Sequence, residues 1–367
     1  MILPFILTPM VLSVISSFAM WFGLVPVVSR SVEWTVPVLA SGYLATGSVS
    51  GSLLQAFNLV VGTMIYIPFI RQSERVQDRE FLGKIKRLEA SMNEDERSVW
   101  VRDFRWNTYE NQQTAKLLAS DLEYALSKGA LELYYQPQVK RDGTLYGCEA
   151  LLRWNYMGQG FVYPPLIIAL AVQGDFIGTL GMYIVEKACR DMVGARTQAG
   201  CPVSFSVNIL PLELEDPSFA DQVLKILKDT GVEGSNLTIE LTEQVALNPG
   251  PNLERQLEKL RESRVRISMD DFGMGHGSLN YLNSAHYDEV KIDGSLIRRL
   301  PEHTQTCELV GNIMNMSRIL GVNTVAECVE MPEQIQMLEK LGCSIYQGYY
   351  YSRPLPRDAF IEYVKGL

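Results

Sequence analysis

From residue 114 onward, short apolar runs of the kind found in strands alternate with segments whose apolar residues recur at helical spacing. This alternation is typical of repeated strand and helix units around a parallel sheet or barrel. Helices are predicted at residues 178–198, 217–229, 251–263, 304–319 and 332–341. Strands are predicted at residues 131–138, 146–153, 203–208, 237–241, 267–270, 288–292, 323–326 and 344–346. Because eight strands in about 250 residues suit a closed barrel, we predict an α/β fold of the TIM-like (β/α)8 type.

The first 70 residues follow a different pattern, in which only Arg30 and Glu33 carry charge. The apolar run at 3–28 exceeds the roughly 20 residues needed to cross a bilayer. A second apolar run at 53–70 is followed at once by basic residues, which places the chain after it in the cytoplasm. We therefore expect residues 1–70 to be a membrane-spanning all-α segment in the inner (cytoplasmic) membrane. A signal peptide is disfavoured because the positively charged start is missing, and a buried core helix is the other alternative.

Residues 71–111 are rich in charge and favour a helix, with Phe81, Ile85, Leu88 and Met92 spaced four, three and four apart. An amphipathic linker helix explains this pattern, and a short coiled coil is the alternative, although two heptads are few for one. The chain then divides into a membrane segment at 1–70, a cytoplasmic helical linker at 71–111 and a folded domain at 112–367.

The net charge of −9 argues against DNA or RNA as a partner, because nucleic-acid binding needs basic patches that neutralise phosphates. A phosphate ester remains a possible substrate if metal ions supply the positive charge. The six cysteines are scattered, with no pair at zinc-binding spacing, and we expect them to be packed thiols.

Polar residues stand in or at the end of nearly every predicted strand. The strands of a barrel bring their carboxyl ends together at one mouth, where active sites lie. Several carboxylates at one mouth would repel one another unless cations lie among them, and Mg²⁺, Mn²⁺ or Ca²⁺ prefer such oxygen ligands. The residues concerned are Gln136, Glu149, Asn208, Glu240, Asp270, Asp271, Lys291, Glu327 and Gln347.

The short segments around these residues resemble, in order, the motifs of EAL-family phosphodiesterases, and the resemblance spans residues 112–367. The segments are Tyr135-Gln136-Pro137, Glu149-Ala150-Leu151-Leu152-Arg153, Val207-Asn208, Glu240-Leu241-Thr242-Glu243, Asp270-Asp271-Phe272-Gly273, Lys291-Ile292-Asp293, Ala326-Glu327-Cys328-Val329-Glu330 and Gln347-Gly348-Tyr349. The resemblance implies a barrel of EAL type that hydrolyses cyclic di-GMP to linear pGpG.

The resemblance also implies two divalent cations, Mg²⁺ or Mn²⁺, with Ca²⁺ inhibitory, and a homodimer formed through the EAL domain. One cation would be held by Glu149, Asn208, Glu240 and Asp270, and the other by Asp270, Asp271 and Glu327, with Gln347 beside the metal centre. The implied catalytic residues are Lys291, Glu149 and Glu243, where Lys291 orients or deprotonates the nucleophile and Glu243 holds the loop after Asp271. The implied substrate-binding residues are Gln136, Leu151 and Arg153, and the fork of Arg153 suits a phosphate.

The segment at 1–70 resembles, over about 65 residues, the C-terminal end of the lactose/cellobiose-type permease subunit (IIC) of the sugar phosphotransferase system. The segments that carry this resemblance are Trp34-Thr35-Val36-Pro37, Ser41-Gly42-Tyr43-Leu44-Ala45-Thr46-Gly47 and Tyr66-Ile67-Pro68-Phe69. A remnant of this length cannot form a complete sugar site, so we expect no transport by this chain alone.

Three positions depart from the usual EAL pattern. Cys328 replaces a glycine after Glu327, Val172-Gln173 replaces an acidic pair, and Gly277 stands where serine is common. The first change could shift Glu327 and lower the rate, and the second could weaken a contact on the guanine side. A membrane-tethered receptor that binds cyclic di-GMP without cleaving it is the alternative function, but degenerate receptors lose the metal and lysine residues that this chain keeps.

Overall fold

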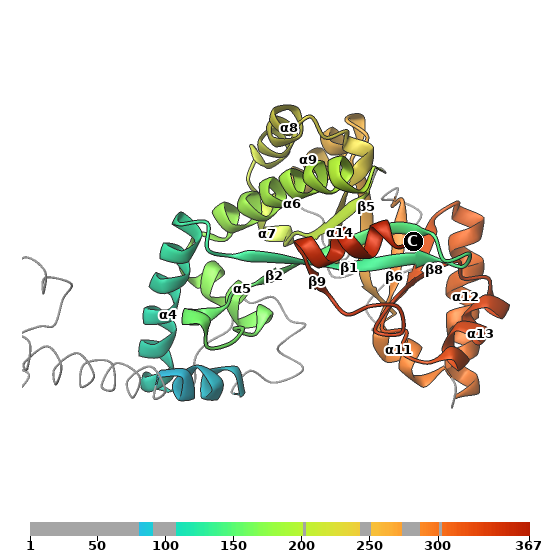
Figure 1. Cartoon of the computed structure of the whole chain (residues 1–367), viewed down its shortest axis with the longest axis horizontal. Coiled ribbons are helices and arrows are strands. Elements are labelled where there is room, and N and C mark those ends of the chain that lie inside the picture. Colours follow the sequence, from blue (N-terminus) through green and yellow to red (C-terminus); the bar gives the residue numbers. More distant parts are fainter. Residues whose placement is uncertain (1–80, 91–107, 201–202, 243–250, 274–286, 301–302) are drawn as a thin grey trace, which may run out of the picture. The chain divides into compact units, whose positions relative to one another are not determined.

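In the part of the chain that the structure describes, eight strands close into a barrel. They are β1 (Glu132–Lys140), β2 (Leu145–Arg153), β3 (Phe205–Asn208), β4 (Leu237–Thr242), β5 (Arg266–Phe272), β6 (Glu289–Ile292), β7 (Asn323–Ala326) and β8 (Ile345–Gln347). Strands β2 to β8 are parallel neighbours in chain order, and β1 pairs with both β8 and β2. The computed structural model describes residues 81–90, 108–200, 203–242, 251–273, 287–300 and 303–367 (Figure 1).

All eight predicted strands are present, with ends within two residues of the predicted ones. The predicted alternation of parallel strands and helices does not extend to β1, which runs antiparallel to both β2 and β8. The reason is the short Asp142–Gly143 turn, in which the Asp142 carboxylate accepts hydrogen bonds from Thr144 and Gly143 takes a φ of 84°. A turn this short joins antiparallel strands, because a parallel crossover needs a dozen or more residues.

Helices cover the outside of the barrel and include the five that the sequence predicts. They are α4 (Tyr109–Ser127), α5 (Pro164–Gln173), α6 (Ile177–Ala199), α7 (Pro211–Leu214), α8 (Phe219–Thr230), α9 (Pro251–Glu262), α11 (Gly294–Arg299), α12 (Thr304–Leu320), α13 (Pro332–Leu341) and α14 (Arg357–Lys365). Helix α8 shows the rule that they follow, since its buried residues Phe219, Ala220, Val223 and Leu227 recur at helical spacing. A further short strand, β9 (Leu355–Pro356), pairs with the start of β1.

Aromatic side chains on the outer face of the barrel pack against β1. The Tyr135 ring lies 5.1 Å from that of Phe205 and 5.5 Å from that of Phe360 on α14, measured between centroids. The Tyr135 hydroxyl donates to the Asp191 carboxylate at 2.5 Å, and Arg357 Nε lies 3.1 Å from the same carboxylate. These contacts hold β1 rigidly, so the side chains on its inner face have a stable platform.

Part of the sequence-based prediction lies outside the described residues. This applies to the membrane segment at 1–70 and to most of the linker at 71–111, of which residues 81–90 form the predicted helix. Among the residues that the structure describes, no helix has the length and apolar character needed to span a membrane. The first helix after the residues left undescribed at 91–107 is α4, which begins at Tyr109.

Candidate active site

The polar residues predicted at the strand ends do meet at one mouth of the barrel. Since β2 to β8 run parallel, their carboxyl ends lie at the same side of the sheet. The contributions are Glu149 from β2, Asn208 from β3, Glu240 from β4, Asp270 and Asp271 from β5, Lys291 from β6, Glu327 directly after β7 and Gln347 from β8. Seven different segments of the chain therefore supply one cluster, which we call the acidic cluster.

Lys291 lies at the centre of the acidic cluster and is 1% exposed. Its Nζ is 2.8 Å from both Glu240 Oε2 and Glu327 Oε1. It is also 3.0 Å from Asp270 Oδ1 and 3.4 Å from Glu149 Oε2. A single ammonium group thus bridges four acids, three from strands β2, β4 and β5 and one directly after β7.

Two amides orient Glu149 on the other side of the cluster. Asn208 Nδ2 donates to Glu149 Oε1 at 2.7 Å, and Gln347 Nε2 donates to Glu149 Oε2 at 2.6 Å. Gln347 is itself held, because its Oε1 accepts from Gln138 Nε2 at 3.0 Å and its Nε2 lies 3.3 Å from Gln136 Oε1. Gln138 was not predicted as a site residue, although the alternation of β1 places it on the same inner face as Gln136.

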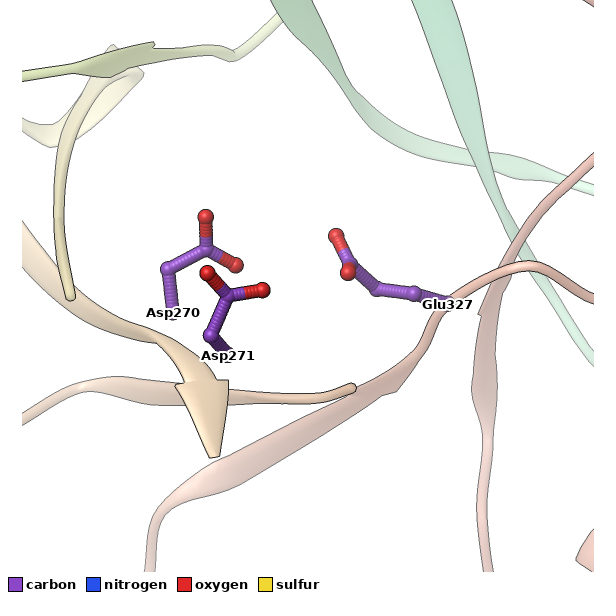
Figure 2. Close-up of side chains that lie close together, drawn as sticks. All are labelled: Asp270, Asp271 and Glu327. Atoms are coloured by element: carbon purple, nitrogen blue, oxygen red, sulfur yellow. The ribbon is translucent and has the colours of Figure 1, made fainter. Parts of the chain in front are cut away.

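Asp270, Asp271 and Glu327 point into one common space (Figure 2). Each offers a carboxylate oxygen, and the three oxygens lie within 4.8 Å of one another. Consecutive residues of a regular strand point to opposite faces, so two adjacent side chains share one space only where the strand is irregular. The pairing of β5 with β6 shifts register between Met269 and Phe272, and Asp271 takes a φ of 56°. This bulge turns Asp271 toward the same space as Asp270.

The charges of the cluster do not balance, because five carboxylates face one ammonium group. Burial raises the pKa of Glu327 to about 8, against the lowering effect of Lys291. Burial, followed by repulsion from Asp270 and Asp293, raises the pKa of Asp271 to about 7. Burial also raises the pKa of Glu240 well above its ordinary value. A site that resists holding all of its carboxylates charged is short of positive charge, and divalent cations would supply it.

Glu149 and Lys291 are charged despite their burial. Burial acts to raise the pKa of Glu149, but the charge of Lys291 and the hydrogen bonds from Gln347 and Asn208 outweigh it, and the pKa is lowered. Burial acts to lower the pKa of Lys291, but the surrounding carboxylates, Asp270 foremost, raise it well above its ordinary value. Lys291 is therefore an ammonium group in this arrangement.

Residues 119–354 match the family described as EAL domain. The chain belongs to this family. Among solved EAL structures, the PaMucR phosphodiesterase in its c-di-GMP complex superposes with a TM-score of 0.63 at 33% identity, covering 66% of this chain and 99% of that one. The EAL enzyme Bd1971, bound to cAMP and cyclic di-GMP, gives a TM-score of 0.65 at 27% identity, covering 69% of this chain and 70% of that one.

Relatives of this EAL domain occur within longer proteins. The oxygen sensor protein DosP of Escherichia coli is 35% identical over 243 residues, which are 66% of this chain and 30% of DosP. The cyclic di-GMP phosphodiesterase RocR of Pseudomonas aeruginosa is 30% identical over 251 residues, which are 67% of this chain and 63% of RocR. The chain thus spans about a third of DosP, and the similarity to both proteins concerns the EAL domain.

The predicted substrate residues of this EAL domain lie on the hairpin of β1 and β2. Gln136 faces Glu149 across the hairpin, and Leu151 faces Tyr134 one step nearer the mouth. Arg153 shares the face of Glu149 and Leu151, because side chains two apart on a strand point the same way. Glu243, the remaining predicted site residue, lies outside the described residues.

Cys328 adopts a backbone conformation that explains the glycine usual in this position. Its φ is 52°, in the left-handed region that glycine enters without steric cost. The cysteine does not remove Glu327 from the cluster, since Glu327 Oε1 still lies 2.8 Å from Lys291 Nζ. Gly294 faces the thiol so closely that a Cβ built there would lie 2.7 Å from Cys328 Cβ. The substitution is accommodated by this glycine on the neighbouring helix α11.

Proposed function

We propose that this chain is a metal-dependent phosphodiesterase that hydrolyses cyclic di-GMP to linear pGpG. The observation that carries the proposal is the acidic cluster, in which the residues expected of an active EAL enzyme meet around Lys291. The names of the relatives support it, since RocR and NbdA of Pseudomonas aeruginosa are both described as cyclic di-GMP phosphodiesterases.

The donor set fits two divalent cations. Hard cations bind carboxylate and amide oxygens, and two buried oxygens of this set, Glu240 Oε1 and Asp270 Oδ1, have no hydrogen-bond partner among the described residues. Asp270 Oδ1 has only the ion pair with Lys291. Glu149, Asn208, Glu240 and Asp270 would hold one cation, and Asp270, Asp271 and Glu327 would hold the other. When bound, the two cations supply Lewis acidity that activates water and stabilises charge on the attacking and leaving oxygens.

The protein's own side chains bind and orient the substrate. The Arg153 guanidinium can grip a phosphate through two parallel N–H donors, and it lies on the same strand face as Glu149. Lys291 is surrounded by carboxylates that keep it charged, which favours an orienting and charge-stabilising role over removal of a proton. The amides of Gln347 and Asn208 keep Glu149 in a single orientation.

A receptor that binds without cleaving is the alternative, and one assay separates the two functions. The purified full chain is incubated with cyclic di-GMP and Mg²⁺ or Mn²⁺, and pGpG is followed by chromatography. We expect the wild type to form pGpG, and Glu149→Ala and Asp270→Ala to lower the rate of pGpG formation by more than about 100-fold. The surface control Asp358→Ala should form pGpG at the wild-type rate. Binding measured by calorimetry without any product would favour the receptor.

Attachment to the membrane through residues 1–70, a cytoplasmic location of the EAL domain and homodimer formation are further proposals. The apolar runs and the basic residues that follow them support the first two. Fractionation of cells that express the full chain tests attachment, and light scattering of the purified protein tests the dimer. Recovery of the chain in the soluble fraction would contradict attachment, and a monomeric mass would contradict the dimer.

A further inference from the structure

The Tyr134 ring lies beside Arg153 at the mouth of the barrel, and a second ring, that of Phe161, lies against Tyr134. Tyr134 lies on β1 two residues before Gln136, and it faces Leu151 across the hairpin. Phe161 comes from the segment between β2 and α5, where it forms an isolated bridge with Asn155. The same segment is held to the end of β2 by the hydrogen bond from Val162 N to Trp154 O at 2.9 Å. Backbone pairing therefore places Tyr134 next to the predicted phosphate contact and Phe161 next to Tyr134.

The Tyr134 ring is the common partner of the Phe161 ring and the Arg153 guanidinium. The Tyr134 and Phe161 ring centroids lie 5.5 Å apart with an interplanar angle of 75°, an edge-to-face arrangement. Arg153 Cζ lies 5.7 Å from the centre of the Tyr134 ring. The Arg153 guanidinium is further held because its Nη1 donates to Leu152 O at 2.9 Å. Tyr134 thus contacts both Phe161 and Arg153 and sets their relative positions.

Phe161 differs from the other exposed aromatic residues. It is 50% exposed and carries no polar group that would gain from contact with water. Tyr349, equally exposed, already has the Arg353 guanidinium 4.4 Å from its ring centre. Tyr124 lies on α4, on the outside of the barrel. Among the described residues, Phe161 is the phenylalanine that is exposed, and its ring lies against Tyr134.

We propose that the exposed ring of Phe161 is a stacking surface for one base of the dinucleotide, with Tyr134 as its positioning residue. This inference rests on the proposed function and extends it to how the base is held. A nucleotide whose phosphate contacts Arg153 has its base within reach of a ring that Tyr134 holds near the guanidinium. Stacking on an aromatic side chain strengthens binding of a base by about tenfold or more and accepts any base, because every base has a flat face.

Replacement of the ring tests the proposal. Phe161→Leu keeps apolar bulk but removes the flat surface, whereas Phe161→Trp keeps an aromatic face. We expect the Leu variant to raise KM about tenfold with kcat within twofold of the wild type, and the Trp variant to restore KM. The control is Tyr124→Ala, which removes an exposed aromatic ring on α4, outside the barrel. It should leave both KM and kcat unchanged. A KM within twofold of the wild type in the Leu variant, or no rescue by Trp, would overturn the stacking role.

A second readout separates this inference from the proposed function. GMP and ribose 5-phosphate are compared as competitors of cyclic di-GMP binding in calorimetry with Ca²⁺ present. Because GMP carries a base, it should compete more strongly than ribose 5-phosphate in the wild type. This difference between the two competitors should disappear in Phe161→Leu. If the wild type binds the dinucleotide without cleaving it, the same comparison still decides the role of Phe161, while the proposed catalysis fails. No binding of the dinucleotide by the wild type would overturn both.

Discussion

The contact between Cys328 and Gly294 permits a sharp test of how a nonglycine residue is accommodated beside Glu327, a proposed metal ligand. A Cβ built at Gly294 would lie 2.7 Å from Cys328 Cβ and nearer still to its Sγ, whereas the next atom, Arg298 Nη1, is 3.3 Å away. Gly294→Ala should therefore lower the free energy of unfolding by about 2 kcal/mol, the cost of inserting a methyl group into a packed site. In a Cys328→Gly background, the added methyl group of Gly294→Ala meets only the flexible Arg298 side chain and should cost less than about 0.5 kcal/mol. The difference between the two costs is a coupling of about 1–2 kcal/mol between the two positions.

The backbone at Cys328 adds a second expectation. At a φ of 52°, a residue with a Cβ destabilises the folded state by about 1–2 kcal/mol, and glycine avoids this cost. Glycine in turn lowers stability by about 0.5–1 kcal/mol because its unfolded chain has more conformational freedom. Cys328→Gly and Cys328→Ala lose the same sulfur, so their difference isolates the backbone. We expect Gly to be more stable than Ala by up to about 1 kcal/mol, the reverse of their order in a helix.

The assay is thermal unfolding of the full chain by circular dichroism, for the wild type, the three single variants and the double variant. A change of 1 kcal/mol corresponds to about 2–4 °C in a domain of this size. Turnover with Mg²⁺ or Mn²⁺ is measured for each variant, and Cys328→Gly should keep or raise it. Additive effects of the two glycine-site changes, or greater stability of Ala than Gly at 328, would refute the reasoning. A Cys328→Gly variant that melts normally but has lost all turnover would show that the thiol has a function in catalysis.

Three further outcomes are expected. Lys291→Ala should reduce kcat by more than about 100-fold while calorimetry still detects binding of the dinucleotide, and a variant with normal kcat would contradict the role of Lys291. The same variant should lower the free energy of unfolding of the metal-free protein by about 3–5 kcal/mol, because four carboxylates lose their partner. Ca²⁺ added to the Mg²⁺ enzyme should inhibit pGpG formation because its coordination is longer and looser, and equal rates with both ions would contradict this. Glu213 on α7 has a pKa raised to about 8 by burial, against the effect of the hydrogen bond from Leu210 N. The folded chain then binds this proton more tightly than the unfolded chain, so the stability from this group is greatest below an ordinary carboxyl pKa and falls as the pH rises toward 8. Glu213→Gln should flatten the decline in melting temperature over this pH range. Parallel curves of melting temperature against pH for the wild type and the variant would exclude Glu213 as the source of the decline.

The eight strands and five helices could be predicted from the chain alone because each carries a periodic pattern of apolar residues. The exception was the direction of β1, although the Asp142–Gly143 turn signals a hairpin. The predicted site residues were located by a topological rule, since parallel strands bring their ends to one mouth. Four of them, Glu149, Glu240, Asp270 and Glu327, lie within 3.4 Å of Lys291 Nζ, as that rule expects.

Other features depend on the folded arrangement. Adjacent Asp270 and Asp271 share one space only because β5 carries a bulge, which leaves no periodic signal. The pairing of Phe161 with Tyr134 joins an irregular segment to a strand, and the fit of Cys328 against Gly294 joins two elements 34 positions apart. Local pattern thus determined which elements form and which polar residues they carry, because that depends on burial along one element. The distances between elements, the charge state of Lys291 and the exposure of Phe161 were decided by the tertiary structure, because each is set by neighbours that are remote in the chain.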